Sequence, residues 1–92
     1  MQVIEVLCNT GLGSGLFIEM NIREILERHG LDDRFETKHG ALYDVDWLAI
    51  SFAVVVRDLA PFVNAPPSCK LIVLDSVVDA DELERKLLAE LK

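Results

Sequence analysis

The sequence predicts an α/β fold in which a single parallel β-sheet carries helices on both faces. Apolar segments of strand length alternate along the chain with amphipathic segments of helix length, and this alternation is typical of β-α-β units. Right-handed crossovers join the parallel strands of such units. The chain has 92 residues, which is enough for one domain and too short for a second. We therefore expect residues 1–92 to form a single domain.

The first predicted unit is a strand at residues 3–7, a glycine-rich loop at residues 8–14 and a helix at residues 15–29. The helix is indicated by apolar side chains that recur on one face. These side chains belong to Ile18, Ile22, Ile25 and Leu26. Residues 34–38 then alternate polar and apolar side chains, which predicts a strand that is covered on one face or lies at a sheet edge.

The second half of the chain predicts two further strands and two helices. Residues 47–51 are nearly all apolar, which is typical of a strand buried on both faces, and residues 53–62 are expected to form the next helix. The valines within residues 53–62 also favour a strand, so both alternatives are kept. A strand at residues 70–74 and a C-terminal helix, capped by Asp79 or Asp81, complete the pattern.

Composition and charge exclude several classes of protein. The net charge is −7, which would repel a phosphate backbone, so we expect no nucleic-acid partner. The longest apolar stretch, residues 47–56, is far shorter than the roughly 20 residues that span a bilayer, so no membrane insertion is expected. The N-terminus lacks the basic segment and cleavage site of a secretory signal. These features predict a cytoplasmic protein in which Cys8 and Cys69 are both reduced.

The loop after the first strand is the most informative segment, because it places a thiol where parallel α/β proteins bind their ligands. Its residues are Cys8, Asn9, Thr10, Gly11, Leu12, Gly13, Ser14 and Gly15. The backbone N–H groups of such a loop, together with the dipole of the following helix, stabilise a thiolate or a phosphate. Ser51 and Asp75 are expected at the same edge of the sheet, each directly after its strand.

The loop differs from the common nucleotide, redox and metal motifs. Leu16 stands where a dinucleotide-binding loop has its third glycine, and Gly11 stands where a redox Cys-x-x-Cys motif has its second cysteine. The loop also lacks the lysine of a P-loop, and the cysteines and histidines lack the spacing of metal ligands, so we expect no metal and no other cofactor. Thiol phosphatases and arsenate reductases use Cys-x5-Arg, but here Ser14 occupies the arginine position, which favours retention of a phosphate over its hydrolysis.

Other residues with reactive side chains are expected to have structural roles. His29 lies at a predicted helix end, where a positive charge is favourable, and His39 lies in a predicted loop. Cys69 precedes a strand and is expected to pack as a partly buried thiol. We therefore predict no catalytic role for these three residues.

A motif in the loop and the following helix resembles that of a known family. Its residues are Cys8, Gly11, Gly13 and Ser14, followed by Leu16 and the segment Met20-Asn21-Ile22. They are similar to the enzyme IIB component of the bacterial sugar phosphotransferase system, within the lactose/cellobiose-like superfamily and most of all in its ascorbate-type branch. The loop departs from the usual family pattern at Asn9, Thr10 and Gly15.

The resemblance implies a fold and a function. The fold would be a Rossmann-like four-stranded parallel sheet in the order 2-1-3-4, similar to low-molecular-weight tyrosine phosphatase. Cys8 would accept a phosphoryl group from a histidine of a IIA protein, hold it as phosphocysteine with loop residues 9–15 around it, and pass it to a sugar bound by the membrane-embedded IIC permease. Two alternatives are kept: a small thiol phosphatase or arsenate-reductase-like enzyme, and a IIB-like regulatory module that transports nothing.

Overall fold

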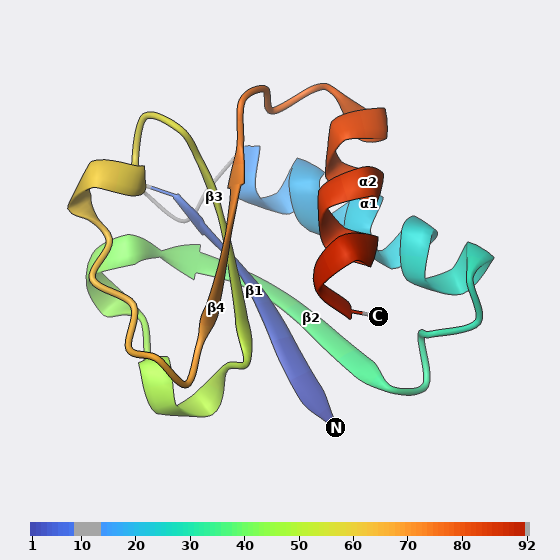
Figure 1. Cartoon of the computed structure of the whole chain (residues 1–92), viewed down its shortest axis with the longest axis horizontal. Helices are drawn as coiled ribbons and strands as arrows, with labels where there is room; N and C mark the ends of the chain where they lie inside the picture. The colour runs from blue at the N-terminus through green and yellow to red at the C-terminus, as the bar shows by residue number, and fades with distance from the viewer. Residues whose placement is uncertain (9–13, 92) are drawn as a thin grey trace.

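A four-stranded parallel sheet organises the chain (Figure 1). The computed structural model describes residues 1–8 and 14–91. Its strands are β1 (Gln2–Cys8), β2 (Phe35–Ala41), β3 (Phe52–Val56) and β4 (Lys70–Leu74), and its α-helices are α1 (Ser14–Arg28) and α2 (Ala80–Leu91). Three 3₁₀ turns complete it, η1 (Leu42–Asp44), η2 (Trp47–Ala49) and η3 (Ala60–Phe62). The strands are parallel in the order β2-β1-β3-β4, so the prediction of an α/β fold with this sheet is confirmed.

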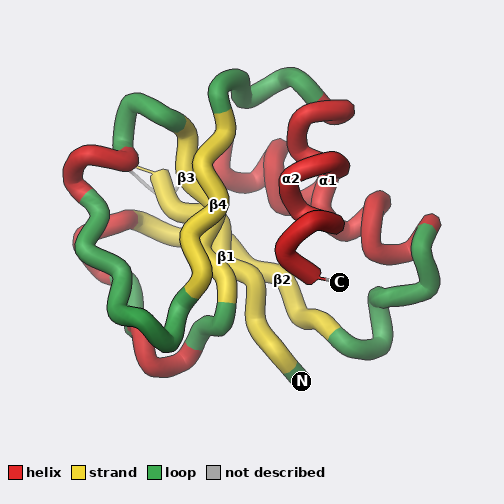
Figure 2. Tube along the Cα trace, in the orientation of Figure 1, coloured by secondary structure: helices red, strands yellow, loops and turns green. Residues whose placement is uncertain are grey.

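Both α-helices lie on the same face of the sheet, so the prediction of α-helices on both faces is wrong (Figure 2). The connection from β1 to β2 crosses the sheet in one direction, and the connections from β2 to β3 and from β3 to β4 cross it in the other. Right-handed crossovers therefore place the two later connections on the face opposite α1. Residues 42–51 and 57–69 do cover that face, but as 3₁₀ turns and loops. In the connection from β3 to β4, Pro61, Pro66 and Pro67 disfavour an α-helix.

Strand β3 is formed by Phe52–Val56, which corrects both the strand predicted at residues 47–51 and the helix predicted at residues 53–62. The strand alternative for the valine run is therefore the right one. Val54 and Val55 face opposite sides of the sheet and are both fully buried, which suits β-branched side chains in a central strand.

The segment predicted as the third strand instead forms η2, Trp47–Ala49, because the Asp46 side chain accepts a hydrogen bond from the Leu48 N–H (3.2 Å). Ser51 consequently precedes β3 and lies at the amino edge of the sheet, where its N–H donates to the Val3 carbonyl (2.9 Å). Its predicted place at the ligand-binding edge is wrong. Asp75, in contrast, directly follows β4 at the carboxyl edge, as predicted.

Strand β2 is longer than the predicted residues 34–38 and includes His39 and Gly40. It pairs with β1 along its whole length, and the register sets Val6 beside His39 and Cys8 beside Ala41. His39 is therefore a sheet residue and not the loop residue that was predicted. This difference places an imidazole at the carboxyl end of the sheet.

The C-terminal helix begins after an aspartate cap, as the sequence predicts. Asp79 is the cap, since its Oδ1 accepts a hydrogen bond from the Glu82 N–H at 3.0 Å. Helix α2 then packs Leu83 and Leu87 into the core that it shares with α1 and the sheet. The predicted helix and its aspartate cap are therefore both confirmed.

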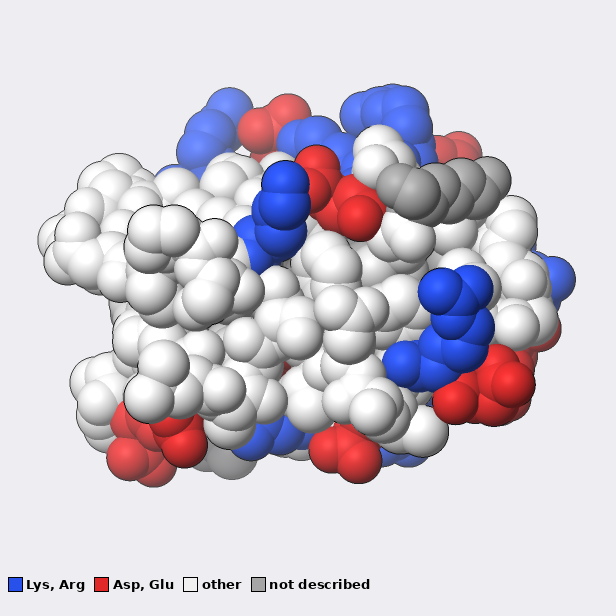
Figure 3. Space-filling view, turned by 60° about the horizontal axis from the view of Figure 1, so that its bottom comes forward, with Lys and Arg blue, Asp and Glu red and all other residues white. Residues whose placement is uncertain are grey.

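Figure 3 shows basic and acidic side chains beside one another on the surface. They lie around an area of uncharged residues. Some of these groups form exposed ion pairs, such as Arg28 with Glu84 (3.5 Å) and Lys70 with Glu90 (4.0 Å). Exposed pairs of this kind contribute little to stability. Within residues 1–8 and 14–91, no helix is both long enough and apolar enough to cross a membrane.

A side chain at Gly40 would displace the Glu5 carboxylate, because a Cβ there would lie 2.6 Å from Oε2 of the buried Glu5. We expect Gly40→Ala to lower the free energy of unfolding by about 1–3 kcal/mol, as overpacking typically does. Urea unfolding measures the change. In a Glu5→Ala background the same substitution should cost much less, and an equal cost in both backgrounds would contradict this packing.

Candidate functional site

Cys8 ends β1, so its thiol lies at the carboxyl edge of the sheet, the edge at which parallel α/β proteins bind ligands. The residue is only 8% exposed, and its Sγ lies 3.8 Å from the Gly40 carbonyl oxygen, to which it donates. Gly15, in the first turn of α1, is buried against it: a Cβ on Gly15 would lie 3.1 Å from Sγ. The amino end of α1 therefore packs directly on the thiol, an arrangement that favours a thiolate or a bound anion.

The structure brings His39 to the same place. The Cβ position of Gly15 that lies 3.1 Å from the Cys8 sulfur lies 3.5 Å from Cβ and 3.9 Å from Cδ2 of His39. Thiol and imidazole thus flank one glycine, each within 4 Å of a common point. Sequence analysis missed this residue because it ended the second strand at residue 38, one position before His39.

A buried carboxylate holds the imidazole. Glu19, on α1, is 4% exposed, and its Oε1 lies 2.6 Å from Nδ1 of His39. Its Oε2 accepts hydrogen bonds from Oγ1 of Thr37 (2.9 Å) and from the Arg23 guanidinium (3.0 Å). Glu19 is not among the apolar side chains that predict this helix, and it is buried because Thr37 and His39 of β2 lie over it.

The ionisation of Glu19 determines the tautomer of His39. Burial pushes the pKa of Glu19 upward, but the hydrogen bonds from His39 and Thr37, with the Arg23 charge, outweigh this effect and lower the pKa. Glu19 is therefore a carboxylate at neutral pH and can only accept hydrogen bonds. Nδ1 of His39 must carry a proton to donate to it, which leaves Nε2 to accept or donate a proton elsewhere.

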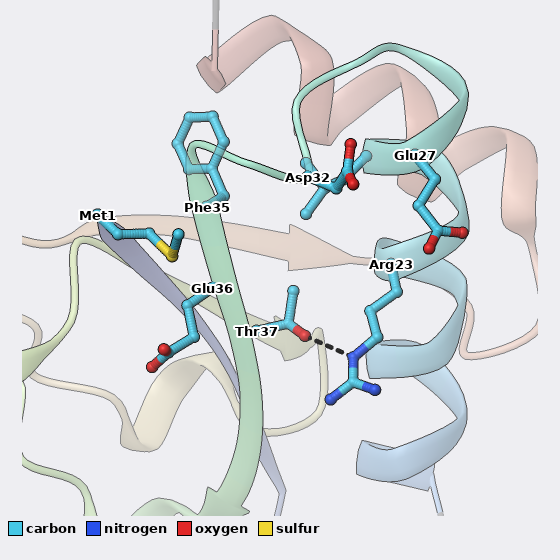
Figure 4. A pocket seen from close by; sticks show the side chains of 8 residues that line it. Met1, Arg23, Glu27, Asp32, Phe35, Glu36 and Thr37 are labelled. Carbon is cyan, nitrogen blue, oxygen red and sulfur yellow. Dashed lines mark hydrogen bonds between the residues drawn. The ribbon is translucent and has the colours of Figure 1, made fainter.

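A cavity of about 370 Å³ lies between α1 and β2, separate from the thiol (Figure 4). It is lined by Met1, Arg23, Leu26, Glu27, Asp32, Phe35, Glu36 and Thr37. Figure 4 shows the Arg23 side chain pointing to Thr37, and its Nε donates to Oγ1 at 2.9 Å. Because the β2 residues of the cavity come from the amino half of that strand, whereas Cys8 pairs with Ala41 at its end, the cavity adjoins the Glu19 network and not the thiol.

Most of the predicted phosphate-holding loop lies outside the described residues. This applies to Asn9, Thr10, Gly11, Leu12 and Gly13, whose roles stay predictions. Ser14 begins α1, and Gly15 is the loop residue whose place beside the thiol is described. Asp75 shares the carboxyl edge and lies 3.8 Å from the Arg57 guanidinium and 3.9 Å from the Lys86 amine.

Cys69 and His29 lie apart from this site. Cys69 is buried, and burial together with the nearby Glu5 charge raises the pKa of its thiol, which makes it a poor nucleophile. His29 follows α1 and lies 2.8 Å from a Glu84 carboxylate oxygen on α2, at the opposite end of α1 from Cys8.

Among the described residues, no three His, Cys, Asp or Glu side chains are grouped so that they could hold a metal ion. The chain matches no protein-family model, and a search of curated proteins finds no match either. The candidate site therefore rests on its own geometry: a thiol, a helix amino end and a carboxylate-bound imidazole at one edge of the sheet.

Proposed function

We propose that the protein is a IIB-type phosphoryl carrier of a sugar-uptake phosphotransferase system, of the ascorbate type that the loop motif resembles. Cys8 would accept a phosphoryl group from a IIA phosphohistidine and pass it to a sugar bound by a IIC permease, in the cytoplasm. The observation that carries the proposal is the packing of Gly15, at the amino end of α1, against the Cys8 thiol. The sheet order β2-β1-β3-β4, which is the one implied by the resemblance, adds support. Similarity to low-molecular-weight tyrosine phosphatase is part of the same proposal.

Phosphoryl transfer requires little of the protein beyond positioning of the reacting groups and stabilisation of charge. The Cys8 sulfur attacks the phosphorus atom of the donor, an S–P bond forms, and the P–N bond of the donor breaks. The amino end of α1 then stabilises the negative phosphate attached to sulfur. Accepting and releasing a phosphoryl group therefore uses one nucleophile and one anion-binding helix end.

The environment of the nearest arginine in sequence favours a carrier over a phosphatase. Thiol phosphatases bind the phosphate of the intermediate with an arginine six residues after the cysteine, and Ser14 occupies that position. Arg23 is the first arginine after the loop, and its guanidinium is bound to Glu19 and Thr37. A phosphocysteine without an arginine contact should hydrolyse slowly and persist until an acceptor arrives.

Donor-dependent phosphorylation tests the proposal. The full chain is incubated with a IIA protein of an ascorbate-type system that carries phosphate on its histidine, and intact mass reports the product. We expect one phosphoryl group on the parent and on Cys69→Ser, and none on Cys8→Ser. A phosphoryl group that survives Cys8→Ser, or rapid turnover of an aryl phosphate by the parent, would refute the carrier role.

A further inference from the structure

We propose that His39, held in place by Glu19, is a catalytic residue of the Cys8 site: it takes the thiol proton as the phosphoryl group arrives and then faces the phosphocysteine as an imidazolium. This inference rests on the proposed function and adds a residue to it. It assigns to the site a proton acceptor and a positive charge, neither of which the loop motif supplies.

The geometry supports this role in two ways. Nδ1 of His39 is fixed on the Glu19 carboxylate at 2.6 Å, so the ring has one orientation and one tautomer. The Cδ2 atom, which is bonded to Nε2, is within 3.9 Å of the Cβ position of Gly15 that is itself 3.1 Å from the Cys8 sulfur. The Cδ2 side of the ring thus faces Gly15, which also contacts the thiol, and we infer that Nε2 reaches the sulfur through a water molecule or through the phosphoryl group itself.

Charged groups approach His39 from both neighbouring elements. From α1 it faces the Glu19 carboxylate directly, while the Arg23 charge is neutralised at the same carboxylate at 3.0 Å. From β1, the Cys8 sulfur approaches the same Cβ position of Gly15 that His39 contacts. Two further charges belong to the opposite face, where the Glu5 carboxylate lies against Gly40 and pairs with Lys38 of β2 at 3.8 Å.

The buried Glu19 carboxylate supports the role of His39 as the acceptor of the thiol proton. A carboxylate that accepts from Nδ1 raises the basicity of the other ring nitrogen and stabilises the imidazolium once it forms. Because Glu19 is also bound by Thr37 and Arg23, it cannot turn away when the ring charge changes. In this proposal the Glu19 carboxylate holds the His39 ring, and the ring exchanges a proton with the Cys8 sulfur.

Phosphoryl transfer to Cys8 moves one proton to His39. The S–H bond of Cys8 breaks and its proton goes to Nε2 of His39, while the sulfur electron pair forms the S–P bond. The P–N bond of the donor breaks, and its electron pair returns to the donor ring, which leaves as neutral imidazole because its other nitrogen carries a proton. When a sugar hydroxyl later attacks phosphorus, the S–P electron pair returns to sulfur, which recovers the proton from His39, and the hydroxyl proton passes to water.

The pH dependence of Cys8 alkylation tests the thiol–imidazole pair without any phosphoryl donor. The full chain carries Cys69→Ala in every sample, so that iodoacetamide modification followed by intact mass reports Cys8 alone. We expect His39→Asn and Glu19→Gln to slow alkylation at pH 7 by about tenfold and to move the midpoint of the profile to higher pH. Coincident profiles for the parent and His39→Asn would overturn the inference.

His29→Asn is the matched control, because His29 also binds a glutamate, Glu84, but at the far end of α1. It should leave the alkylation profile unchanged. ¹⁵N NMR of the parent provides a readout that needs no variant: we expect His39 to be protonated at Nδ1, and a ring protonated only at Nε2 would also overturn the inference.

Donor-dependent phosphorylation of the same samples separates this inference from the proposed function. Equal phosphorylation rates for the parent and His39→Asn would refute the inference and leave the carrier role standing. A second outcome is that the alkylation profiles of the parent and His39→Asn differ but the parent accepts no phosphate. This outcome would refute the carrier role and its phosphoryl step, and would support the thiol–imidazole pair alone.

Discussion

Replacing Ile22 with alanine is expected to lower the free energy of unfolding by about 2–5 kcal/mol, the range found for large-to-small substitutions in protein cores. Ile22 is fully buried on the face of α1 that packs against the sheet, in the core shared with Val54 and Leu87. The cavity left by its truncation would cost a large fraction of the stability of a domain of this size. Urea unfolding monitored by circular dichroism measures the effect.

Met20→Ala is the matched control, because Met20 lies on the same helix but is 55% exposed. Its replacement should change the free energy of unfolding by no more than about 0.5 kcal/mol. Equal losses for Ile22→Ala and Met20→Ala would contradict the packing of α1 on the sheet. Since α1 also carries Gly15 and Glu19, a loss of this packing would disturb the thiol site as well.

Glu82→Gln is expected to lower the melting temperature at pH 7 by several degrees, with a difference that disappears in acid. The Glu82 carboxylate is buried and accepts hydrogen bonds from the Lys86 amine (2.8 Å) and from the backbone N–H groups of Asp75 (2.7 Å) and Ser76 (3.1 Å). These bonds, with the Lys86 contact first, lower the pKa of Glu82 from its ordinary value of 4.5 to about 2. Glu82 thus ties the turn after β4 to α2 at the carboxyl edge of the sheet.

The sign of the pH dependence follows from this lowered pKa. The folded state holds the Glu82 proton less tightly than the unfolded state, so its contribution to stability is complete above about pH 4.5 and is lost as the pH falls toward 2. Melting curves of the parent and Glu82→Gln between pH 2 and pH 7 test this, with the exposed Glu24→Gln as a control. A difference that does not change with pH would contradict the role assigned to the carboxylate.

The elements that the sequence predicts well are those with one clear pattern. The apolar face of α1 and the apolar run of β4 each leave one interpretation, and the aspartate cap of α2 leaves two, Asp79 and Asp81; the structure agrees to within a residue or two, with Asp79 as the cap. The stretch from residue 47 to residue 56 is different, because it is apolar throughout and longer than one strand. Asp46 decides the register by capping a 3₁₀ turn, and a local hydrogen bond of this kind leaves no trace in apolar periodicity.

The thiol of the candidate site could be predicted from sequence, whereas its histidine and glutamate could not. Cys8 is marked by a strand, a glycine-rich loop and a helix that are consecutive in the chain. His39 and Glu19 meet only because β2 extends to Ala41 and pairs with β1 in a register that sets His39 beside Val6, under α1. That register depends on tertiary packing, and sequence periodicity alone places Glu19 on a solvent face.

The proposed carrier role depends on phosphorylation of Cys8, which ³¹P NMR of the full chain detects after incubation with the phosphorylated IIA protein. We expect a resonance of phosphorus bonded to sulfur in the parent and in Cys69→Ser, and its absence in Cys8→Ser. A resonance of phosphorus bonded to oxygen or nitrogen of this chain, or a phosphorus signal that remains in Cys8→Ser, would contradict it.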